Sequence, residues 1–399
     1  MGGAVKESIL LTGATGALGS MILKRLCREG YNVVCLVRAQ DRNEARARIG
    51  AIVGNRENVK VIRGDVTEPR CGISEIDRER LAGRIERVLH CAASISFYDK
   101  NAVQQTNVAG VLHVLELTEV LDAWHLLHVS TAYVLGDASY LSERSLSVGQ
   151  RWRNPYEESK FVGEKIVRAW ALKRDERRFT IFRPSVLVGS EDGTTPTFDG
   201  YYRYFEPIHR AAEDLRDRKG KVLPPDINVE DNGVVRVPFA VVMADKRINY
   251  VSIDWVADMI VAAVEAPARN ETYHLVHHDP VRLHEGLSWT LDHLKVEGIV
   301  VCDTLAAKNI AVRTQTPLVK RMQRRIDIVH AAYAPYCTTE SRFEMETAAR
   351  SLGKKFRLPP IVDERFLRRT LNYALQNNWG AEKLNGNALV RPSAQTIRT

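Results

Sequence analysis

Tyr156 and Lys160 stand four positions apart in a stretch that is predicted to be a helix beginning near Pro155. Residues at i and i+4 share one face of a helix, so the Lys160 ammonium can lie beside the Tyr156 phenol. A neighbouring cation favours phenolate and is expected to lower a pKa that is about 10 in the free side chain. Such a tyrosine can give a proton to a carbonyl oxygen, or take one from an alcohol, near neutral pH. The spacing recurs by chance in many helices, so its meaning depends on the rest of the chain.

A glycine-rich turn near the start of the chain joins a predicted strand to a predicted helix. Gly13, Gly16 and Gly19 follow the apolar run 8–12, and apolar residues then recur at helical spacing from 17 to 29. Such glycines let a pyrophosphate approach backbone N–H groups, and the helix N-terminus attracts its negative charge. An ordinary glycine turn is the competing interpretation. The strand–turn–helix setting favours dinucleotide binding.

The end of the second predicted strand indicates which dinucleotide is bound. Arg38 stands nineteen positions after Gly19, where an acidic residue would hold the ribose of NAD and an arginine suits the 2′-phosphate of NADP. Asp41 lies beyond the strand end, and Arg48 can add a second contact from the following helix. A solvated cation at the strand end is the alternative for Arg38. The sequence favours NADPH.

Strands and helices alternate through residue 190, which predicts an α/β protein with a Rossmann-type, doubly wound parallel sheet. We expect a core over 1–190, an insertion on the substrate side over 191–247 and a return to the core over 248–265. A smaller, mostly helical substrate lobe is expected over 266–385, with a flexible tail over 386–399. Aromatic residues within 198–207 are expected to pack the lobe, with an acyl pocket as the alternative. Ligands of such sheets lie at the carboxyl ends of the strands.

Composition argues against several other classes of protein. A hydrophobic fraction of 45% and a charged fraction of 27% are ordinary for a globular protein. The net charge of +8 is dispersed and lacks an aromatic-rich nucleic-acid motif. Its densest part, 320–325, is expected to be a solvated helix face, with docking to an acidic carrier or a membrane surface as the alternative.

We expect a cytoplasmic protein with no transmembrane segment, no signal peptide and no metal site. No apolar stretch reaches the length of a membrane span. The six cysteines form no C-x-x-C pair, and reduced thiols are expected. The histidines at 274, 277 and 278 lack nearby acidic or cysteine partners at ligand spacing.

Together these segments resemble the extended short-chain dehydrogenase/reductase family. The matching motifs are the loop 12–19, Gly64-Asp65-Val66, His90-Cys91-Ala92-Ala93, Asn107-Val108-Ala109-Gly110, His128-Val129-Ser130-Thr131, Tyr156-x-x-x-Lys160, Arg183-Pro184-Ser185 and the segment 248–260. The resemblance covers roughly residues 8 to 265 and implies the same sheet and a shared site.

The resemblance also implies residue roles. Tyr156 would be the proton donor, Lys160 would bind the ribose and tune Tyr156, and Thr131 would be the third catalytic member. We choose Thr131 over Ser130 because it stands twenty-five positions before Tyr156, and because strand alternation points the two side chains oppositely. Asn107 has helix-start packing or a proton relay as alternatives. Asp65 and Val66 would contact the adenine, and Pro184, Ser185 and Val186 would contact the nicotinamide. The other expected cofactor-binding residues are Gly13, Thr15, Gly16, Ala17, Leu18, Gly19, Arg38, Arg48, Ala92, Ala93, Tyr156 and Lys160.

Within the family, the strings 33–39 and 45–49 are similar to thioester reductases. These include terminal reductase domains of carboxylic acid reductases and peptide synthetases, and fatty acyl-CoA reductases. The resemblance implies NADPH-dependent reduction of an acyl thioester, carried by coenzyme A or a carrier protein, to an aldehyde or on to an alcohol. An extended dehydrogenase or epimerase acting on a hydroxysteroid or nucleotide sugar is one alternative, and a non-catalytic NADP sensor is the other. The presence of Thr131, Tyr156 and Lys160 counts against the sensor.

Overall fold

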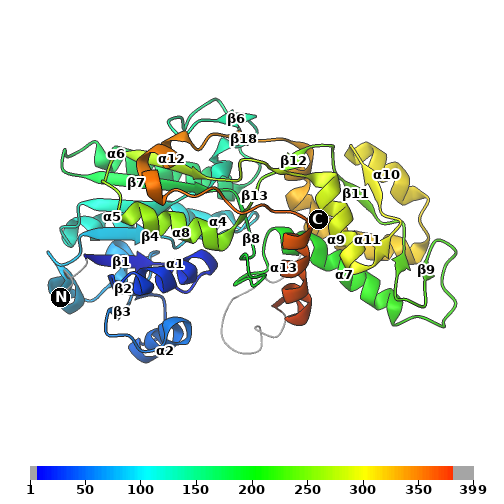
Figure 1. Ribbon diagram of the computed structural model, residues 1–399, viewed down its shortest axis with the longest axis horizontal. Coiled ribbons are helices and arrows are strands. Elements are labelled where there is room, and N and C mark those ends of the chain that lie inside the picture. The colour runs from blue at the N-terminus through cyan, green and yellow to red at the C-terminus, as the bar shows by residue number, and fades with distance from the viewer. Residues whose placement is uncertain (1–6, 381–399) are drawn as a thin grey trace. The chain divides into compact units, whose positions relative to one another are not determined.

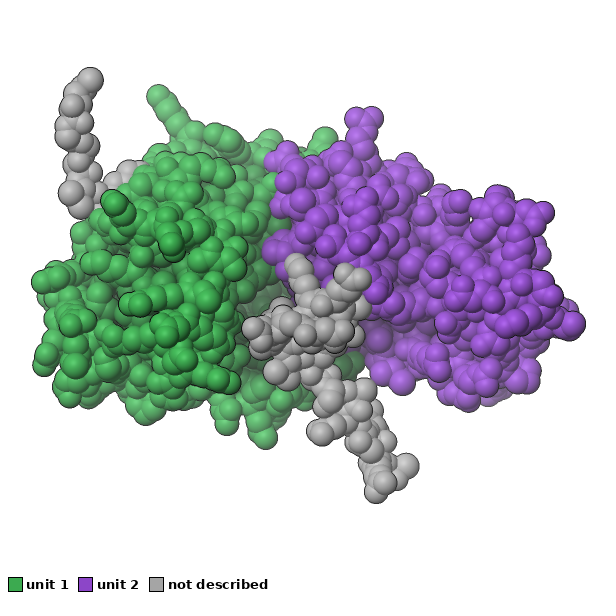
Figure 2. Space-filling model, turned by 90° about the horizontal axis from the view of Figure 1, so that it is seen from below, with its two compact units in different colours: residues 1–187, 247–281, 339–361 green, residues 188–246, 282–338, 362–399 purple. Residues whose placement is uncertain are grey.

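The computed structural model describes residues 7–380 and divides into two compact units. Unit 1 comprises the chain up to Leu187 together with Arg247–Val281 and Thr339–Ile361, and unit 2 comprises Val188–Lys246, Arg282–Thr338 and the chain from Val362 on (Figure 2). The expected tail over 386–399 lies outside the described residues. The segments 266–281 and 339–361, which the sequence assigned to the substrate lobe, belong to unit 1.

The centre of unit 1 is a seven-stranded sheet in which every neighbouring pair is parallel (Figure 1). Its order is β14-β7-β5-β4-β1-β2-β3. The strands are β1 (Ser8–Thr12), β2 (Asn32–Val37), β3 (Val59–Arg63), β4 (Arg87–His90), β5 (His125–Val129), β7 (Arg178–Pro184) and β14 (Glu271–Leu275). The order reverses between β1 and β4, which is the switch point of a doubly wound sheet. The predicted fold class is confirmed.

Helices cover both faces of this sheet, as parallel strands require. On one face, α1 (Ala17–Arg28), α2 (Arg42–Val53), α8 (Ile253–Val264) and α12 (Glu346–Leu352) contribute to one apolar cluster with the strand residues Ile9 and Leu11. On the other face, α3 (Glu75–Leu81), α5 (Gly110–Val120) and α6 (Pro155–Ala171) pack with Leu10 and its neighbours. The alternation along β1 thus supplies both cores.

Short elements complete unit 1. They are α4 (Lys100–Val103), the π-helix Gln104–Ala109, the 3₁₀ helices Pro69–Gly72, Ala132–Leu135 and Gly353–Lys355, and the short strands β6 (Tyr140–Leu141), β8 (Val186–Val188), β12 (Arg247–Ile248), β13 (Tyr250–Ser252), β15 (Val281–Arg282) and β18 (Arg342–Phe343). β18 pairs with β6 and returns the late segment to unit 1. The last residues of β8 and β15 lie in unit 2.

Unit 2 is mostly helical. It contains α7 (Tyr201–Arg216), α9 (Leu283–Leu294), α10 (Leu305–Arg313), α11 (Pro317–Thr338) and α13 (Glu364–Gln376), with β9 (Asn228–Val229), β10 (Val235–Arg236), β11 (Ala240–Val242), β16 (Val296–Glu297) and β17 (Val300–Cys302). The aromatics of α7 are buried, and Tyr204 stacks on His330 with ring centroids 3.9 Å apart. On α11, Arg321, Arg324 and Arg325 are exposed, so the basic stretch is an exposed helix face.

The glycine turn between β1 and α1 depends on a close backbone approach. Gly13 has a φ of 74°, in the left-handed region that favours glycine. A Cβ on Gly19 would lie 2.0 Å from the Gly13 carbonyl oxygen, so α1 can begin this close to β1 only with glycine there. The spacing of the glycines is therefore a packing requirement of this turn.

Gly19→Ala tests that requirement. The clash is with backbone that cannot rotate away, so we expect a loss of about 1–3 kcal/mol in unfolding free energy and at least tenfold weaker dinucleotide binding. Denaturant unfolding and cofactor fluorescence titration measure the two effects. The control is Gly50→Ala in α2, where an added Cβ meets nothing within 4 Å; this change should stabilise the helix by about 0.5–1 kcal/mol. Equal behaviour of the two variants would contradict the packing requirement.

Candidate active site

The predicted site residues follow the carboxyl ends of six neighbouring strands in unit 1. These residues are Gly13 after β1, Arg38 after β2, Asp65 after β3, Ala92 after β4, Thr131 after β5 and Ser185 after β7. Because all these strands are parallel, their carboxyl ends lie along one edge of the sheet. The structure thus gathers residues separated by up to 172 positions in the chain.

The glycine turn offers an open helix N-terminus to a negative group. Gly16 is the N-cap of α1 and has no side chain to bond the free N–H groups, and the first turn contains no acidic residue. A Cβ on Gly13 would lie 2.5 Å from the Ala92 nitrogen, so the turn also lies against the segment after β4. Ala17 and Leu18 form the start of the helix. This arrangement fits a dinucleotide pyrophosphate, because backbone N–H groups and the helix dipole are both available to it.

Two arginines meet beside the glycine turn. Arg48, on α2, donates hydrogen bonds to the Arg38 carbonyl oxygen and to Thr15 Oγ1, the latter at 3.3 Å. The Arg38 side chain is exposed. Asp41 caps α2 by accepting from the N–H groups of Asn43 and Glu44. The acid near the strand end is therefore used by the helix, and the Arg48 guanidinium lies beside the turn.

The segments after β3 and β4 form further parts of the candidate site. Asp65 Oδ1 accepts hydrogen bonds from the backbone N–H and the hydroxyl of Thr67, both at 2.9 Å, and Val66 is buried. Ala92 N–H donates to Thr12 Oγ1 at 3.3 Å, and Ala93 is exposed. Both segments are held by local hydrogen bonds.

Tyr156 lies in the first turn of α6, whose start is defined by its sequence. Asn154 caps the helix by accepting from the Glu157 N–H at 3.0 Å, and Pro155 occupies the first turn without an unpaired N–H. The Thr131 hydroxyl interacts with the Tyr156 phenol and favours its ionised form. Thr131 is buried, and its hydroxyl donates to the Pro184 carbonyl oxygen at 3.4 Å. Two hydroxyl groups thus converge between α6 and the end of β5.

Lys160 lies one turn later on α6 and is 2% exposed. Its Nζ donates to the Val129 carbonyl oxygen at 2.6 Å, two residues before Thr131. Burial lowers the pKa of Lys160 to about 8, against the opposing effect of nearby Cys91 and Glu164. A lysine with this pKa changes its charge close to physiological pH.

The pKa of Tyr156 differs from the expectation that Lys160 would lower it. Burial raises the pKa of Tyr156 to about 12, and the hydrogen bond from Thr131 only limits the increase. The reason is geometric, since the Lys160 ammonium bonds to the strand carbonyl of Val129. Tyr156 is therefore a neutral phenol at neutral pH.

Ser130 has a different environment from Thr131. Its hydroxyl donates to Glu164 Oε1 at 2.7 Å, and both side chains are buried. Arg183 makes two bonds to the same carboxylate, at 2.9 and 2.8 Å. Burial alone would raise the pKa of Glu164, but Arg183 and its neighbours hold it below its ordinary value. Thr131, and not Ser130, is the hydroxyl residue in contact with Tyr156.

Asn107, just before α5, is a residue whose role the sequence left open. Asn107 lies in the π-helix Gln104–Ala109 and is 1% exposed. Its Oδ1 accepts from the Ser94 N–H and its Nδ2 donates to the Ser94 carbonyl oxygen, both at 2.8 Å. The same Nδ2 also donates to Ser159 Oγ at 2.9 Å. Every polar atom of this side chain is therefore used to hold the segment after β4 against α6. π-Helical turns are frequent at functional sites.

Phe97 is the site residue for which the sequence carried no signal. Its ring centroid lies 6.2 Å from that of Tyr156. It lies in the irregular segment between β4 and α4, where no periodic pattern indicates which side chains face inward. Only the three-dimensional structure brings it to the tyrosine.

The residues after β7 complete the site. Pro184 accepts from Thr131, as described above, and Ser185 Oγ lies 2.6 Å from Asn249 Oδ1. The Val186 N–H donates to the Asn249 carbonyl oxygen at 3.1 Å. Asn249, which lies between β12 and β13, therefore anchors this segment.

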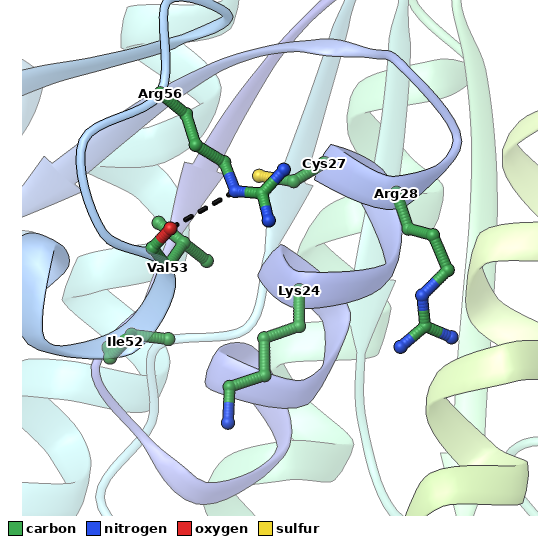
Figure 3. A pocket seen from close by; sticks show the side chains of 6 residues that line it. All are labelled: Lys24, Cys27, Arg28, Ile52, Val53 and Arg56. Atoms are coloured by element: carbon green, nitrogen blue, oxygen red, sulfur yellow. Dashed lines mark hydrogen bonds between the residues drawn. The ribbon is translucent and has the colours of Figure 1, made fainter.

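A separate pocket lies at the other end of α1. It is lined by Lys24, Cys27, Arg28, Ile52, Val53 and Arg56, and Arg56 Nε donates to the Val53 carbonyl oxygen at 3.0 Å (Figure 3). The glycine turn is at the N-terminus of this helix, roughly 15 Å away at 1.5 Å per residue. None of the predicted site residues lines this pocket.

Within residues 7–380, no three His, Cys, Asp or Glu side chains gather closely enough to hold a metal ion. His274, one of the three clustered histidines, instead bonds to the Glu344 carbonyl oxygen at 2.8 Å. None of the helices described here is both long enough and apolar enough to cross a membrane.

Relatives match only part of this chain. A hybrid PKS-NRPS synthetase, pvhA, of Talaromyces variabilis is 32% identical over 196 residues, which is 48% of this chain and 4% of that protein. Fatty acyl-CoA reductase 1 of Mus musculus is 29% identical over 155 residues, covering 34% of this chain and 30% of that protein. The chain therefore corresponds to much less than two thirds of either relative.

A solved structure has a similar fold. The terminal R domain from the myxalamid PKS-NRPS biosynthetic pathway superposes with a TM-score of 0.74 and 23% identity, covering 95% of this chain and 92% of that domain. At this identity the likeness shows the fold alone.

The family model described as male sterility protein, an NAD-binding family, matches residues 11–260, which contain the glycine turn, Thr131, Tyr156 and Lys160. This match spans more than half of the chain. The chain belongs to the male sterility protein family, with an extended short-chain dehydrogenase/reductase fold.

Proposed function

We propose that this chain is an NADPH-dependent reductase of acyl thioesters. The observation that carries the proposal is the meeting of the Thr131 and Tyr156 hydroxyl groups at the carboxyl end of β5, on the same sheet edge as the glycine turn. Two hydroxyl donors converge where the fold binds a nicotinamide dinucleotide. Such donors stabilise the charge that develops on a carbonyl oxygen when a hydride is added.

When bound at the glycine turn, a nicotinamide cofactor would supply the hydride that adds to the substrate carbonyl carbon. As the C=O π bond breaks, the oxygen gains negative charge and accepts a hydrogen bond from Thr131 and a proton from Tyr156. The resulting hemithioacetal loses its thiol as the C–S bond breaks, and an aldehyde remains. A second reduction of this aldehyde gives the alcohol.

The pKa of Tyr156 favours the direction of reduction. A phenol whose pKa is raised to about 12 keeps its proton at neutral pH and is ready to donate it. Lys160 would hold a cofactor ribose and return a proton to the tyrosinate. Asp65 and Val66 would hold the adenine, and Pro184 to Val186 the nicotinamide.

The thioester is the favoured acceptor because of the relatives. One is named as a PKS-NRPS synthetase and another as a fatty acyl-CoA reductase. By this proposal, the substrate is an acyl group on coenzyme A or on a carrier protein. The principal alternative remains an extended dehydrogenase or epimerase for a hydroxysteroid or nucleotide sugar. We also propose a cytoplasmic location for the protein.

The proposal is tested by NADPH absorbance with panels of acyl-CoA, acyl-carrier, sterol and nucleotide-sugar substrates. We expect oxidation with a thioester, and a decrease in kcat of about 10²–10⁴ in Tyr156→Phe, which lacks the proton donor. Tyr140→Phe is the matched control, because Tyr140 is 53% exposed and bonds to Glu344. Turnover of only a sterol or a nucleotide sugar would replace the proposed substrate class, and a fully active Tyr156→Phe would remove Tyr156 from the chemistry.

The pH dependence follows from Lys160. Its ammonium is present below a pKa of about 8 and is lost as pH rises through that value. We therefore expect kcat for reduction to fall on the alkaline side with a midpoint near pH 8. A pH–rate profile at saturating substrate measures this limb. A profile that stays flat to pH 10 would contradict the role of Lys160 in proton return.

Cofactor preference should depend on the arginines beside the glycine turn. Arg48→Ala removes a cation from the 2′-phosphate, and hydrogen bonds to charged groups contribute about 1.5–3 kcal/mol. We expect NADPH to bind roughly tenfold to hundredfold more weakly, with NADH binding unchanged. The control is Arg42→Ala on the same helix, since Arg42 pairs with Asp77 at 2.9 Å. Equal losses for NADPH and NADH would contradict a 2′-phosphate contact.

A further inference from the structure

The first turn of α6 contains a buried carboxylate next to the candidate proton donor. Glu157 follows Tyr156 directly in the chain and is 0% exposed. Its backbone N–H donates to Asn154 Oδ1 at 3.0 Å, and its Oε2 accepts from the backbone N–H of Arg153 at 2.9 Å. These two bonds form a reciprocal cap at the start of the helix. Because a neutral glutamine can make the same cap, capping alone does not require a buried charge here.

The side chain of Arg153 balances the charge of Glu157. Its Nη1 donates to Glu157 Oε1 at 3.1 Å, and the two side chains are 5% and 0% exposed. Removing one partner of a buried ion pair is strongly destabilising, because it leaves the other charge uncompensated. Arg153 therefore has a role in this turn that a neutral side chain of the same length does not fill.

A distant part of the chain also holds Arg153. Its Nη2 donates to Thr339 Oγ1 at 3.1 Å, across 186 positions of the sequence. Thr339 is the first residue of the segment that returns to unit 1 after α11. Because the guanidinium is bonded to both Glu157 and Thr339, it is fixed beside the helix start and differs from an ordinary surface cation.

The negative charge of Glu157 acts on Tyr156. Burial is the main cause that raises the pKa of Tyr156, the Thr131 hydroxyl opposes this increase, and the charge of Glu157 adds to it. A cation paired with the carboxylate weakens this last effect, because the two opposite charges partly cancel at the phenol. Arg153 therefore influences the acidity of the proton donor through Glu157.

We propose that Arg153 is a positioning residue of the reaction, whose guanidinium offsets the charge of Glu157 and so stabilises the tyrosinate that forms when Tyr156 gives its proton to the substrate oxygen. The role in turnover rests on the proposed reductase function. In this step the O–H bond of Tyr156 breaks, its electron pair stays on the phenolate oxygen, and a new O–H bond forms on the substrate. The new negative charge lies near that of Glu157, and the cation of Arg153 reduces the repulsion between them.

The test compares three variants: Arg153→Met removes the cation, Arg153→Lys keeps it, and the double variant Arg153→Met/Glu157→Gln removes both charges. In Arg153→Met the uncompensated carboxylate opposes tyrosinate, so we expect kcat for reduction at pH 7 to fall about three- to tenfold. The lysine variant and the double variant should keep kcat within about twofold of the unmodified protein, since neither leaves a lone negative charge. An equal fall in the double variant would indicate lost packing and would overturn the inference.

The matched control is Arg177→Met. Arg177 is also buried in unit 1, pairs with Glu119 at 2.7 Å and donates to the Trp170 carbonyl oxygen at 3.0 Å. It directly precedes β7, so it lies at the amino end of the strands, opposite the candidate site. Its loss should lower thermal stability and leave kcat unchanged. The same result for Arg153→Met would show a merely structural role and would overturn the inference.

A second readout needs no substrate. With 3-fluorotyrosine in place of Tyr156, the ¹⁹F chemical shift follows ionisation of the phenol as the pH is raised. We expect the midpoint to rise by about one pH unit in Arg153→Met and to stay in place in Arg153→Lys and Arg177→Met. An unchanged midpoint in Arg153→Met would overturn the inference, whatever the activity. If no thioester is turned over but the midpoint moves, the proposed function fails and the effect of Arg153 on Tyr156 stands.

Discussion

Two buried charges on α6 hold the candidate site in place. Lys160 bonds to the carbonyl oxygen of Val129 at the end of β5, and Glu164, one turn later, pairs with Arg183 on β7 and accepts from Ser130. Removing one partner of a buried pair costs about 3–5 kcal/mol, because the remaining charge is left uncompensated. The first turn of α6, with Tyr156, is therefore fixed against the strand ends that carry Thr131 and Ser185. The contact between the two hydroxyl groups depends on this attachment.

The same burial sets the electrostatics of the proton donors. It raises the pKa of the Tyr156 phenol to about 12 and lowers that of Lys160 to about 8, since in both cases the charged form is the one that burial disfavours. The proposed reduction uses the protonated form of both groups. The two shifts together favour a site that gives protons near neutral pH.

The sequence predicted the sheet, the glycine turn and the start of the Tyr156 helix because each depends on local patterns. Apolar runs bounded by glycine identify β1 and β2, and the cap at Asn154 with Pro155 identifies the start of α6. The return of β14 to the sheet was not predicted, because its partner β7 is distant in the chain and tertiary packing decides the pairing. The pKa of Tyr156 was not predicted because it depends on depth of burial. The π-helix around Asn107 was not predicted because its sequence has the same local pattern as an α-helix. Phe97 lies in a segment without periodicity.

The central claim is that this site adds a hydride to a thioester carbonyl, and isotope transfer tests it most directly. Acyl-CoA or an acyl-carrier substrate is incubated with NADPH that is deuterated at the transferable C4 position, and the product is analysed by mass spectrometry. We predict an aldehyde with one deuterium on the former carbonyl carbon, or an alcohol with two, and formation of either product about 10²–10⁴ times more slowly with Tyr156→Phe. Cofactor binding without a deuterated product from any thioester, together with deuterium transfer to another class of carbonyl substrate, would contradict the account.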